Sequence, residues 1–247
     1  IEAPPQRTRK SMMDESGSKL LQERGITADE FQKRSFAAID NGSSVLVAAP
    51  TSSGKTLVAE YAIERALAAG KTVVYTTPIK ALSNQKFKDL ANWLGKEKVG
   101  LLTGDNAIRP DADVVVMTTE VLRNMIYASS PALANLGLVI LDEVHFLQDP
   151  YRGPVWEEVI MQLSASARLV CLSATVSNAH EVAGWIGEVH SECEAVIETT
   201  RPVELHDHFL VFDKRHRRVQ EFRTLRHGES NFEVERYLGK MSEQRNR

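Results

Sequence analysis

The sequence predicts an α/β fold, with a mostly parallel sheet covered by helices on both faces. Seven short apolar runs rich in β-branched residues recur along the chain, and amphipathic helical patterns lie between most of them. The runs are nearly continuous rather than alternating. A strand covered on both faces needs apolar residues at every position, as in a parallel sheet. The strand–helix order therefore predicts a doubly wound α/β domain.

The predicted elements follow one another regularly. Thr27 and Glu30 have the spacing of a capping box, which predicts a helix that runs toward Ile39 and ends at Asn41-Gly42. Apolar periodicity predicts further helices over 55–69 and 154–163 and one that Asn178 caps. The predicted strands are 44–49, 72–77, 99–103, 113–118, 137–142, 168–175 and 194–199.

Composition excludes several classes of protein. A hydrophobic share of 43% and a charged share of 26% exclude an all-disordered or collagen-like chain. No apolar stretch is long enough for a membrane span, and no secretory leader opens the sequence. We therefore expect a cytoplasmic protein without membrane partners, with an organellar stroma or matrix as the alternative. Two cysteines are too few for a disulfide framework or a zinc cage. The net charge of −3 argues against a globally basic nucleic-acid binder but leaves local phosphate contacts open.

Three segments are expected from the composition along the chain. Residues 1–24 are polar and predict a tail, 25–205 contain the α/β pattern, and 206–247 form a linker and charged tail. Residues 213–247 hold ten Lys/Arg and six Asp/Glu, a net charge of +4. Few strand-like runs remain there, so a solvated charged helix or tail and an arm that touches nucleic acid both stay open.

A loop of small residues between a predicted strand and a predicted helix has the pattern of a phosphate-binding loop. Its small residues let backbone N–H groups turn toward phosphate oxygens, and the helix N-terminus adds positive potential. Lys55 is expected to reach the β and γ phosphates of a nucleotide, and Thr56 to offer its hydroxyl to Mg²⁺. The loop consists of Ala49, Pro50, Thr51, Ser52, Ser53, Gly54, Lys55 and Thr56.

Two acids follow the apolar run that ends at Leu141. Ligands bind beyond the carboxyl ends of strands in parallel sheets. Asp142 is therefore placed to hold Mg²⁺ through water, and Glu143 to orient and deprotonate an attacking water. Together with the phosphate loop, these acids predict a nucleoside triphosphatase that works with Mg²⁺.

The order of the motifs resembles that of superfamily 2 helicases. The matching motifs are Thr77–Gln85, Thr103-Gly104-Asp105, Thr118–Arg123, Asp142-Glu143-Val144-His145 and Ser173-Ala174-Thr175. The Pro78–Gln85 and Arg152–Glu158 stretches are similar to the superkiller-type DExH (DEVH-box) RNA helicases. This resemblance covers about residues 26–210. It implies a RecA-like P-loop domain that hydrolyses ATP while the parent helicase moves along a strand and unwinds duplexes or RNA–protein complexes.

The resemblance also implies roles for matched positions. Gln32 resembles the glutamine that pairs with adenine. His145, Ser173, Ala174 and Thr175 resemble residues that couple nucleotide state to strand movement. The set that resembles strand-contacting residues is Pro78, Lys80, Thr103, Gly104, Thr119 and Arg123. Contacts of this kind hold a sugar–phosphate backbone without recognising sequence.

One departure from the family pattern limits the expected activity. Members carry a second RecA-like domain with an Arg-rich motif, and no such run follows Phe212. The sequence therefore resembles a first motor domain whose partners are single-stranded nucleic acid and a second RecA-like domain, and we expect weak activity from this chain alone. Single-stranded RNA is favoured by the branch resemblance. A DNA helicase or translocase domain, or a catalytically idle binding module, remains an alternative; a small-molecule kinase is disfavoured.

Overall fold

The computed structural model describes residues 21, 24–204, 206–213, 217–226 and 229–245. Contacts divide the chain into two units, 1–201 and 202–247. The polar tail predicted over 1–24 lies almost wholly outside the described residues. Among those that are described, no helix combines the length and apolar character needed to span a bilayer.

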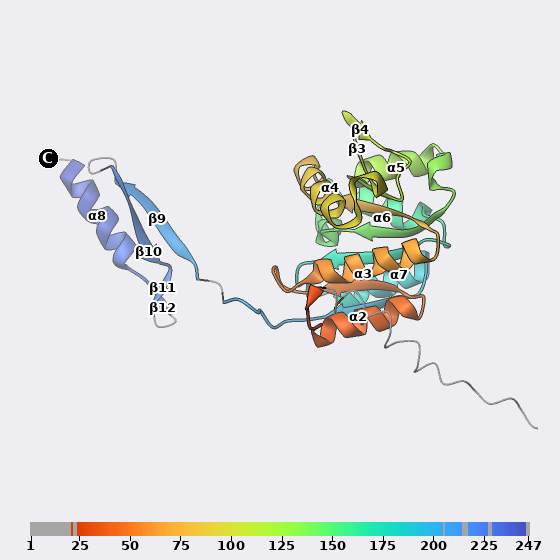
Figure 1. Cartoon of the computed structure of the whole chain (residues 1–247). Helices are drawn as coiled ribbons and strands as arrows, with labels where there is room; N and C mark the ends of the chain where they lie inside the picture. The colour runs from red at the N-terminus through yellow and green to blue at the C-terminus, as the bar shows by residue number, and fades with distance from the viewer. Residues whose placement is uncertain (1–20, 22–23, 205, 214–216, 227–228, 246–247) are drawn as a thin grey trace, which may run out of the picture. The chain divides into compact units, whose positions relative to one another are not determined.

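The first unit is built on an eight-stranded sheet with the order β4-β3-β5-β2-β6-β7-β1-β8; Figure 1 labels β3 and β4 near one end of it. All neighbouring strands are parallel except β4, which pairs antiparallel with β3. The strands are β1 (Ser44–Ala48), β2 (Thr72–Thr77), β3 (Val99–Thr103), β4 (Asn106–Ile108), β5 (Val114–Thr118), β6 (Leu136–Leu141), β7 (Arg168–Ser173) and β8 (Cys193–Ile197). The predicted parallel α/β sheet is confirmed, and β4 is a strand that the sequence analysis missed.

Helices cover both faces of this sheet. The helices are α2 (Glu30–Asp40), α3 (Lys55–Ala68), α4 (Lys80–Leu94), α5 (Thr119–Tyr127), α6 (Gly153–Gln162) and α7 (Ala179–Val189), with short 3₁₀ turns η2 (Lys96–Lys98), η3 (Pro131–Leu133) and η4 (Val144–Gln148). Alternate strand residues divide between two cores. Val45, Val47 and Tyr75 pack with α2, α3 and α4, whereas Leu46, Val74 and Val139 pack with α5, α6 and α7. This two-sided burial explains the continuous apolar runs.

Two predicted helix caps differ from the structure. The capping box of α2 joins Asp29 and Gln32, not Thr27 and Glu30, because Asp29 directly precedes the helix and the Gln32 side chain accepts its backbone N–H. Asn178 precedes α7 but makes no side-chain cap; its Oδ1 instead accepts a hydrogen bond from Gln148 Nε2 at 3.0 Å. The Asn178 side chain thus bonds to a residue 30 positions away and not to the start of its own helix.

The second unit contains a β-hairpin and a helix. Strand β9 (His208–Asp213) pairs antiparallel with β10 (Arg218–Arg223), and a shorter pair joins β11 (Leu225–Arg226) and β12 (Glu229–Ser230). Helix α8 (Glu233–Arg245) follows, and the rings of Phe222 and Tyr237 lie 5.1 Å apart between hairpin and helix. The sequence analysis found few strand-like runs after Phe212 and missed β10, because polar and charged residues separate its two apolar residues, Val219 and Phe222, so that no apolar run marks the strand.

Candidate nucleotide and strand site

The predicted functional residues gather at one edge of the sheet because most of them directly follow a strand. The loop after β1, the acids after β6 and Ser173 at the end of β7 all stand at carboxyl ends. A pocket of about 440 Å³ opens there, with Lys55, Thr56, Asp142, Glu143 and Ala174 among its lining residues. The geometry thus brings the phosphate loop and the acid box (Asp142 and Glu143) to one cavity.

The loop after β1 has the shape of an anion cradle. Ser52 (φ 68°) and Gly54 (φ 87°) adopt left-handed backbone conformations, and α3 begins directly at Lys55. Ser53 Oγ is buried and has no hydrogen-bond partner among the described residues. A buried polar atom without a partner is costly unless a ligand or water satisfies it. The loop therefore offers a donor, a helix N-terminus and small side chains to an anion.

Gly54 is the position in this loop that tolerates a side chain least. A Cβ built on Gly54 would lie 2.7 Å from Gln32 Nε2, and the left-handed φ adds strain. We expect Gly54→Ala to lower the free energy of unfolding by about 1–2 kcal/mol. Denaturant unfolding measures this effect. Gly184→Ala is the control, because Gly184 lies within α7 with no atom within 4 Å of the built Cβ; an equal loss in both variants would contradict the assignment of strain to the loop.

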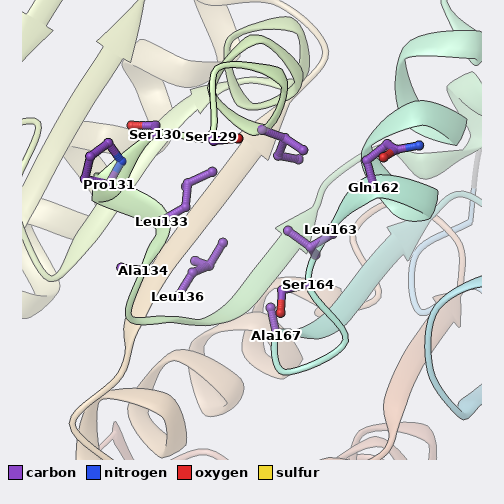
Figure 2. A pocket seen from close by; sticks show the side chains of 11 residues that line it. Ser129, Ser130, Pro131, Leu133, Ala134, Leu136, Gln162, Leu163, Ser164 and Ala167 are labelled. Carbon is purple, nitrogen blue, oxygen red and sulfur yellow. The ribbon is translucent and has the colours of Figure 1, made fainter.

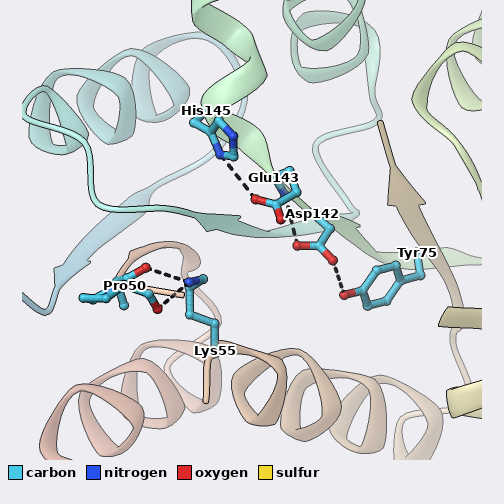
Figure 3. Close-up of polar contacts among 7 residues, drawn as sticks. Pro50, Lys55, Tyr75, Asp142, Glu143 and His145 are labelled. Atoms are coloured by element: carbon cyan, nitrogen blue, oxygen red, sulfur yellow. Dashed lines mark hydrogen bonds and ion pairs between the residues drawn. The ribbon is translucent and has the colours of Figure 1, made fainter. Parts of the chain in front are cut away.

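Lys55 is folded back onto its own loop. Its Nζ donates to the carbonyl oxygens of Ala49 (2.6 Å) and Pro50 (2.9 Å). Figure 3 shows Lys55 beside Pro50. Partial burial lowers the pKa of Lys55, and the negative charges of Glu143 and Asp142 oppose that shift. The ammonium group thus faces two acids across the pocket while weak neutral acceptors hold it.

The acid box is held from two sides. Asp142 Oδ1 accepts the backbone N–H of Glu143 at 3.0 Å, and Asp142 Oδ2 accepts the hydroxyl of Tyr75 at 2.8 Å (Figure 3). Glu143 itself has a left-handed backbone (φ 57°), and its Oε2 lies 3.3 Å from His145 Nδ1. Residues with such strained backbones tend to cluster at functional sites. Burial, followed by the charge of Asp142, raises the pKa of Tyr75 well above its usual value.

Gln32 contacts the phosphate loop. It is buried, and its Nε2 donates to the Gly54 carbonyl at 3.1 Å while its Oε1 accepts from Asp29. Both ends of the amide are therefore engaged within the protein. Its role with adenine stays a prediction.

The residues predicted to contact a strand differ in accessibility. Lys80 and Gly104 are exposed and Arg123 is partly exposed, whereas Pro78, Thr103 and Thr119 are buried. Thr119 Oγ1 donates to the Thr77 carbonyl at 3.5 Å, so its hydroxyl faces inward. Because Thr119 is fully buried in this structure, its contact with a strand stays a prediction.

The coupling residues also differ in their surroundings. Ser173 is fully buried and its Oγ has no partner within the described part of the chain, whereas Thr175 is exposed. Ser173 Oγ therefore makes no local hydrogen bond with the described residues. His145 lies beside Phe146, with ring centroids 5.1 Å apart, and Phe146 stacks on Trp156 at 5.9 Å. Ring contacts thus connect His145, two residues after Glu143, to Trp156 on α6.

Sequence reasoning missed two polar residues at this edge. Tyr75, on β2, supplies a hydrogen bond to Asp142. Asp105 was quoted within a motif but given no role, yet it pairs with Lys80. A tyrosine in a strand and an acid in a turn are ordinary residues, so only the spatial pairing identifies them.

Another pocket, of about 340 Å³, lies at the opposite edge of the sheet (Figure 2). Leu136, which begins β6, and Ala167, which precedes β7, contribute to its lining. None of the predicted site residues lines it. The predicted site residues therefore do not extend to this pocket.

A phosphate loop that faces two acids at the carboxyl edge of a parallel sheet defines a RecA-like P-loop domain. Residues 29–182 match the DEAD/DEAH box helicase family, so the chain belongs to this family. Membership implies an ATP-binding helicase motor domain.

Three known proteins are similar to this chain in sequence. The chain is 56% identical over 186 residues to the probable helicase HelY of Mycobacterium tuberculosis, covering 75% of this chain and 20% of that protein. It is 52% identical over 183 residues to a chloroplastic DExH-box ATP-dependent RNA helicase of Arabidopsis thaliana, covering 72% of this chain and 16% of that protein. It is 50% identical over 183 residues to human superkiller complex protein 2 (74% and 14% covered). The resemblance to the superkiller-type branch is confirmed, and the chain spans a fifth or less of these relatives.

Solved structures agree on the fold. The structure of the DUF1998 helicase MrfA bound to DNA matches with a TM-score of 0.63 and 21% identity, covering 80% of this chain and 30% of that one. A hypothetical ATP-dependent RNA helicase from Sulfolobus tokodaii matches with a TM-score of 0.58 and 20% identity, covering 75% of this chain and 57% of that one. At these identities the likeness supports the RecA-like fold alone.

Proposed function

We propose that this chain is the first motor domain of an ATP-dependent RNA helicase, in which ATP hydrolysis drives movement along single-stranded RNA and unwinding. The observation that supports it most directly is the single pocket lined by Lys55, Thr56, Asp142 and Glu143. Lys55 binds the β and γ phosphates, and Glu143 accepts a proton from the attacking water. A second RecA-like domain is the proposed partner in the parent protein.

The residues present suit Mg²⁺. No group of three His, Cys, Asp or Glu side chains is placed to hold a metal within the part of the chain that the structure describes. Mg²⁺ usually binds one or two protein oxygens together with water and substrate phosphates. The Thr56 hydroxyl and the Asp142 carboxylate, which line the same pocket, are oxygen ligands of that kind. Mg²⁺ would neutralise charge that develops on the phosphates.

The proposal of RNA as the strand is supported by the names of the relatives, including an ATP-dependent RNA helicase at 52% identity. Its test compares the ATPase rate of the chain with no strand, with single-stranded RNA and with single-stranded DNA of the same base order. We expect weak basal activity and stimulation by RNA. Stimulation by DNA alone would favour the DNA translocase alternative, and nucleotide binding without any strand effect would favour an idle module.

Lys80 is the strand contact whose surroundings are most informative. Its Nζ lies 2.5 Å from Asp105 Oδ2, and Thr103 Oγ1 donates to Asp105 Oδ1 at 3.1 Å. The hydrogen bond from Lys80 has the largest effect in lowering the pKa of Asp105, and the hydrogen bond from Thr103 adds to it. The carboxylate therefore occupies the donors that a backbone phosphate would use.

We expect Asp105→Asn to tighten RNA binding about two- to five-fold, because an exposed ion pair competes only modestly with phosphate. Lys80→Ala should weaken binding and reduce the slope of log affinity against log salt by about 0.7. Fluorescence anisotropy with a labelled oligonucleotide at several salt concentrations measures both. Asp111→Asn is the charge-matched control, since Asp111 precedes β5 at the opposite edge. Equal tightening by both Asn variants would mean that only net charge matters.

A further inference from the structure

Tyr75 is a buried tyrosine with its polar end at the acid box. It lies on β2, 1% exposed, within the core formed with α2, α3 and α4. Its hydroxyl is 2.8 Å from Asp142 Oδ2 (Figure 3). It is not among the residues that line the nucleotide pocket, so it can act there only through Asp142.

The neighbouring strand fixes both the backbone and the side chain of Asp142. Strands β2 and β6 are paired in register, with Tyr75 opposite Ile140, and the pairing continues as the Asp142 N–H donates to the Thr76 carbonyl at 3.1 Å. The carboxylate then accepts one hydrogen bond on each oxygen, from the Glu143 backbone and from Tyr75. Rotation of the carboxylate would break at least one of these bonds, and each oxygen keeps a further lone pair.

The ring of Tyr75 is also held in place. Lys86, which does line the pocket, places its Nζ 5.3 Å from the ring centroid. With its ring packed in the core and its hydroxyl bonded to Asp142, Tyr75 has little freedom to turn away. A fixed donor behind a metal-binding carboxylate is the arrangement that orients such ligands.

We propose that Tyr75 is a positioning residue that orients Asp142 toward the Mg²⁺ that accompanies ATP. This inference rests on the proposed function of the pocket. It differs from a purely structural role for Tyr75, because it predicts a change in Mg²⁺ dependence rather than in stability alone.

The chain offers a closely matched control. Tyr61 is likewise 1% exposed, and its hydroxyl bonds to a carboxylate, Asp40 Oδ2, at 2.7 Å. That pair joins α3 to the last residue of α2 and does not line the nucleotide pocket. Tyr61→Phe and Tyr75→Phe therefore remove the same hydroxyl from similar surroundings, and both should lower the melting temperature.

The experiment measures binding of a fluorescent ATP analogue to the full chain as Mg²⁺ is titrated, and again in EDTA. Tyr75→Phe should raise the Mg²⁺ concentration for half-maximal effect about 10–100-fold and leave metal-free binding unchanged. Tyr61→Phe should match wild type in both. An unchanged Mg²⁺ dependence in Tyr75→Phe, or an equal shift in Tyr61→Phe, would overturn the proposal.

Two further variants separate this inference from the proposed function. If Asp142→Asn leaves the Mg²⁺ dependence unchanged, the metal assignment itself fails. If Asp142→Asn shifts it and Tyr75→Phe does not, only the role of Tyr75 fails. The double variant Tyr75→Phe/Asp142→Asn should behave like Asp142→Asn alone, because Tyr75 acts through that carboxylate; additive shifts would contradict the mechanism.

Discussion

Glu143→Gln is expected to slow ATP hydrolysis about 10²–10⁴-fold while leaving ATP binding close to that of wild type. Glutamine keeps the size and polarity of the side chain but cannot accept the proton of the attacking water. Glu143 lines the pocket beside Asp142. Its carboxylate lies 3.3 Å from His145 Nδ1, and the residue is only partly buried. The loss should therefore appear in the rate and not in the affinity.

The measurement is single-turnover hydrolysis with protein in excess over ATP and single-stranded RNA present. Glu188→Gln, an exposed position on α7, controls for the change in net charge. Asp142→Asn is compared with Glu143→Gln, because its main effect should be weaker Mg²⁺-dependent binding of ATP rather than a slower hydrolysis step. Identical binding defects in the Glu143 and Asp142 variants would count against separate roles for the two acids.

Much of the fold follows from the sequence because burial on both faces leaves a strong pattern. The run 72–77 matches β2 and 99–103 matches β3, and the other five predicted strands differ by only one or two residues at their ends. Helices α4 and α5 were not predicted individually, and among the strands the exceptions are those whose pattern is weak. Strand β4 has three residues and is mostly exposed, and β10 exposes most of its side chains. A strand that buries little apolar surface has no continuous run to reveal it.

The site was predictable where its chemistry depends on chain order. The loop of residues 49–56 and the acids Asp142 and Glu143 are adjacent to strand ends, so a parallel sheet must bring them to one edge. The hydrogen bond between Tyr75 and Asp142 spans 67 positions and depends on the β2–β6 register, which no local pattern specifies. The same applies to Gln32 and Gly54, which are 22 positions apart.

Lys55→Ala is expected to weaken ATP binding by at least about 30-fold, which corresponds to the ~2 kcal/mol lower bound for removing one partner of a partly buried charge pair. The ammonium group of Lys55 bonds to two loop carbonyls, Ala49 and Pro50, in a pocket that also holds two acids. A triphosphate that enters the pocket without this cation faces Asp142 and Glu143 with no compensating charge from the loop. Because the lysine head bonds only to its own loop, the rest of the fold should be retained.

Titration with a fluorescent ATP analogue measures the loss, and thermal unfolding checks that the variant is folded. Lys71→Ala is the control: Lys71 directly precedes β2, at the opposite edge of the sheet, and its Nζ contacts Asn135 at 3.4 Å. It removes the same charge far from the loop and should leave affinity unchanged. Wild-type affinity in a folded Lys55→Ala variant would show that the loop of residues 49–56 does not bind the nucleotide phosphates, and the roles proposed for Thr56, Asp142 and Tyr75 would lose their basis with it.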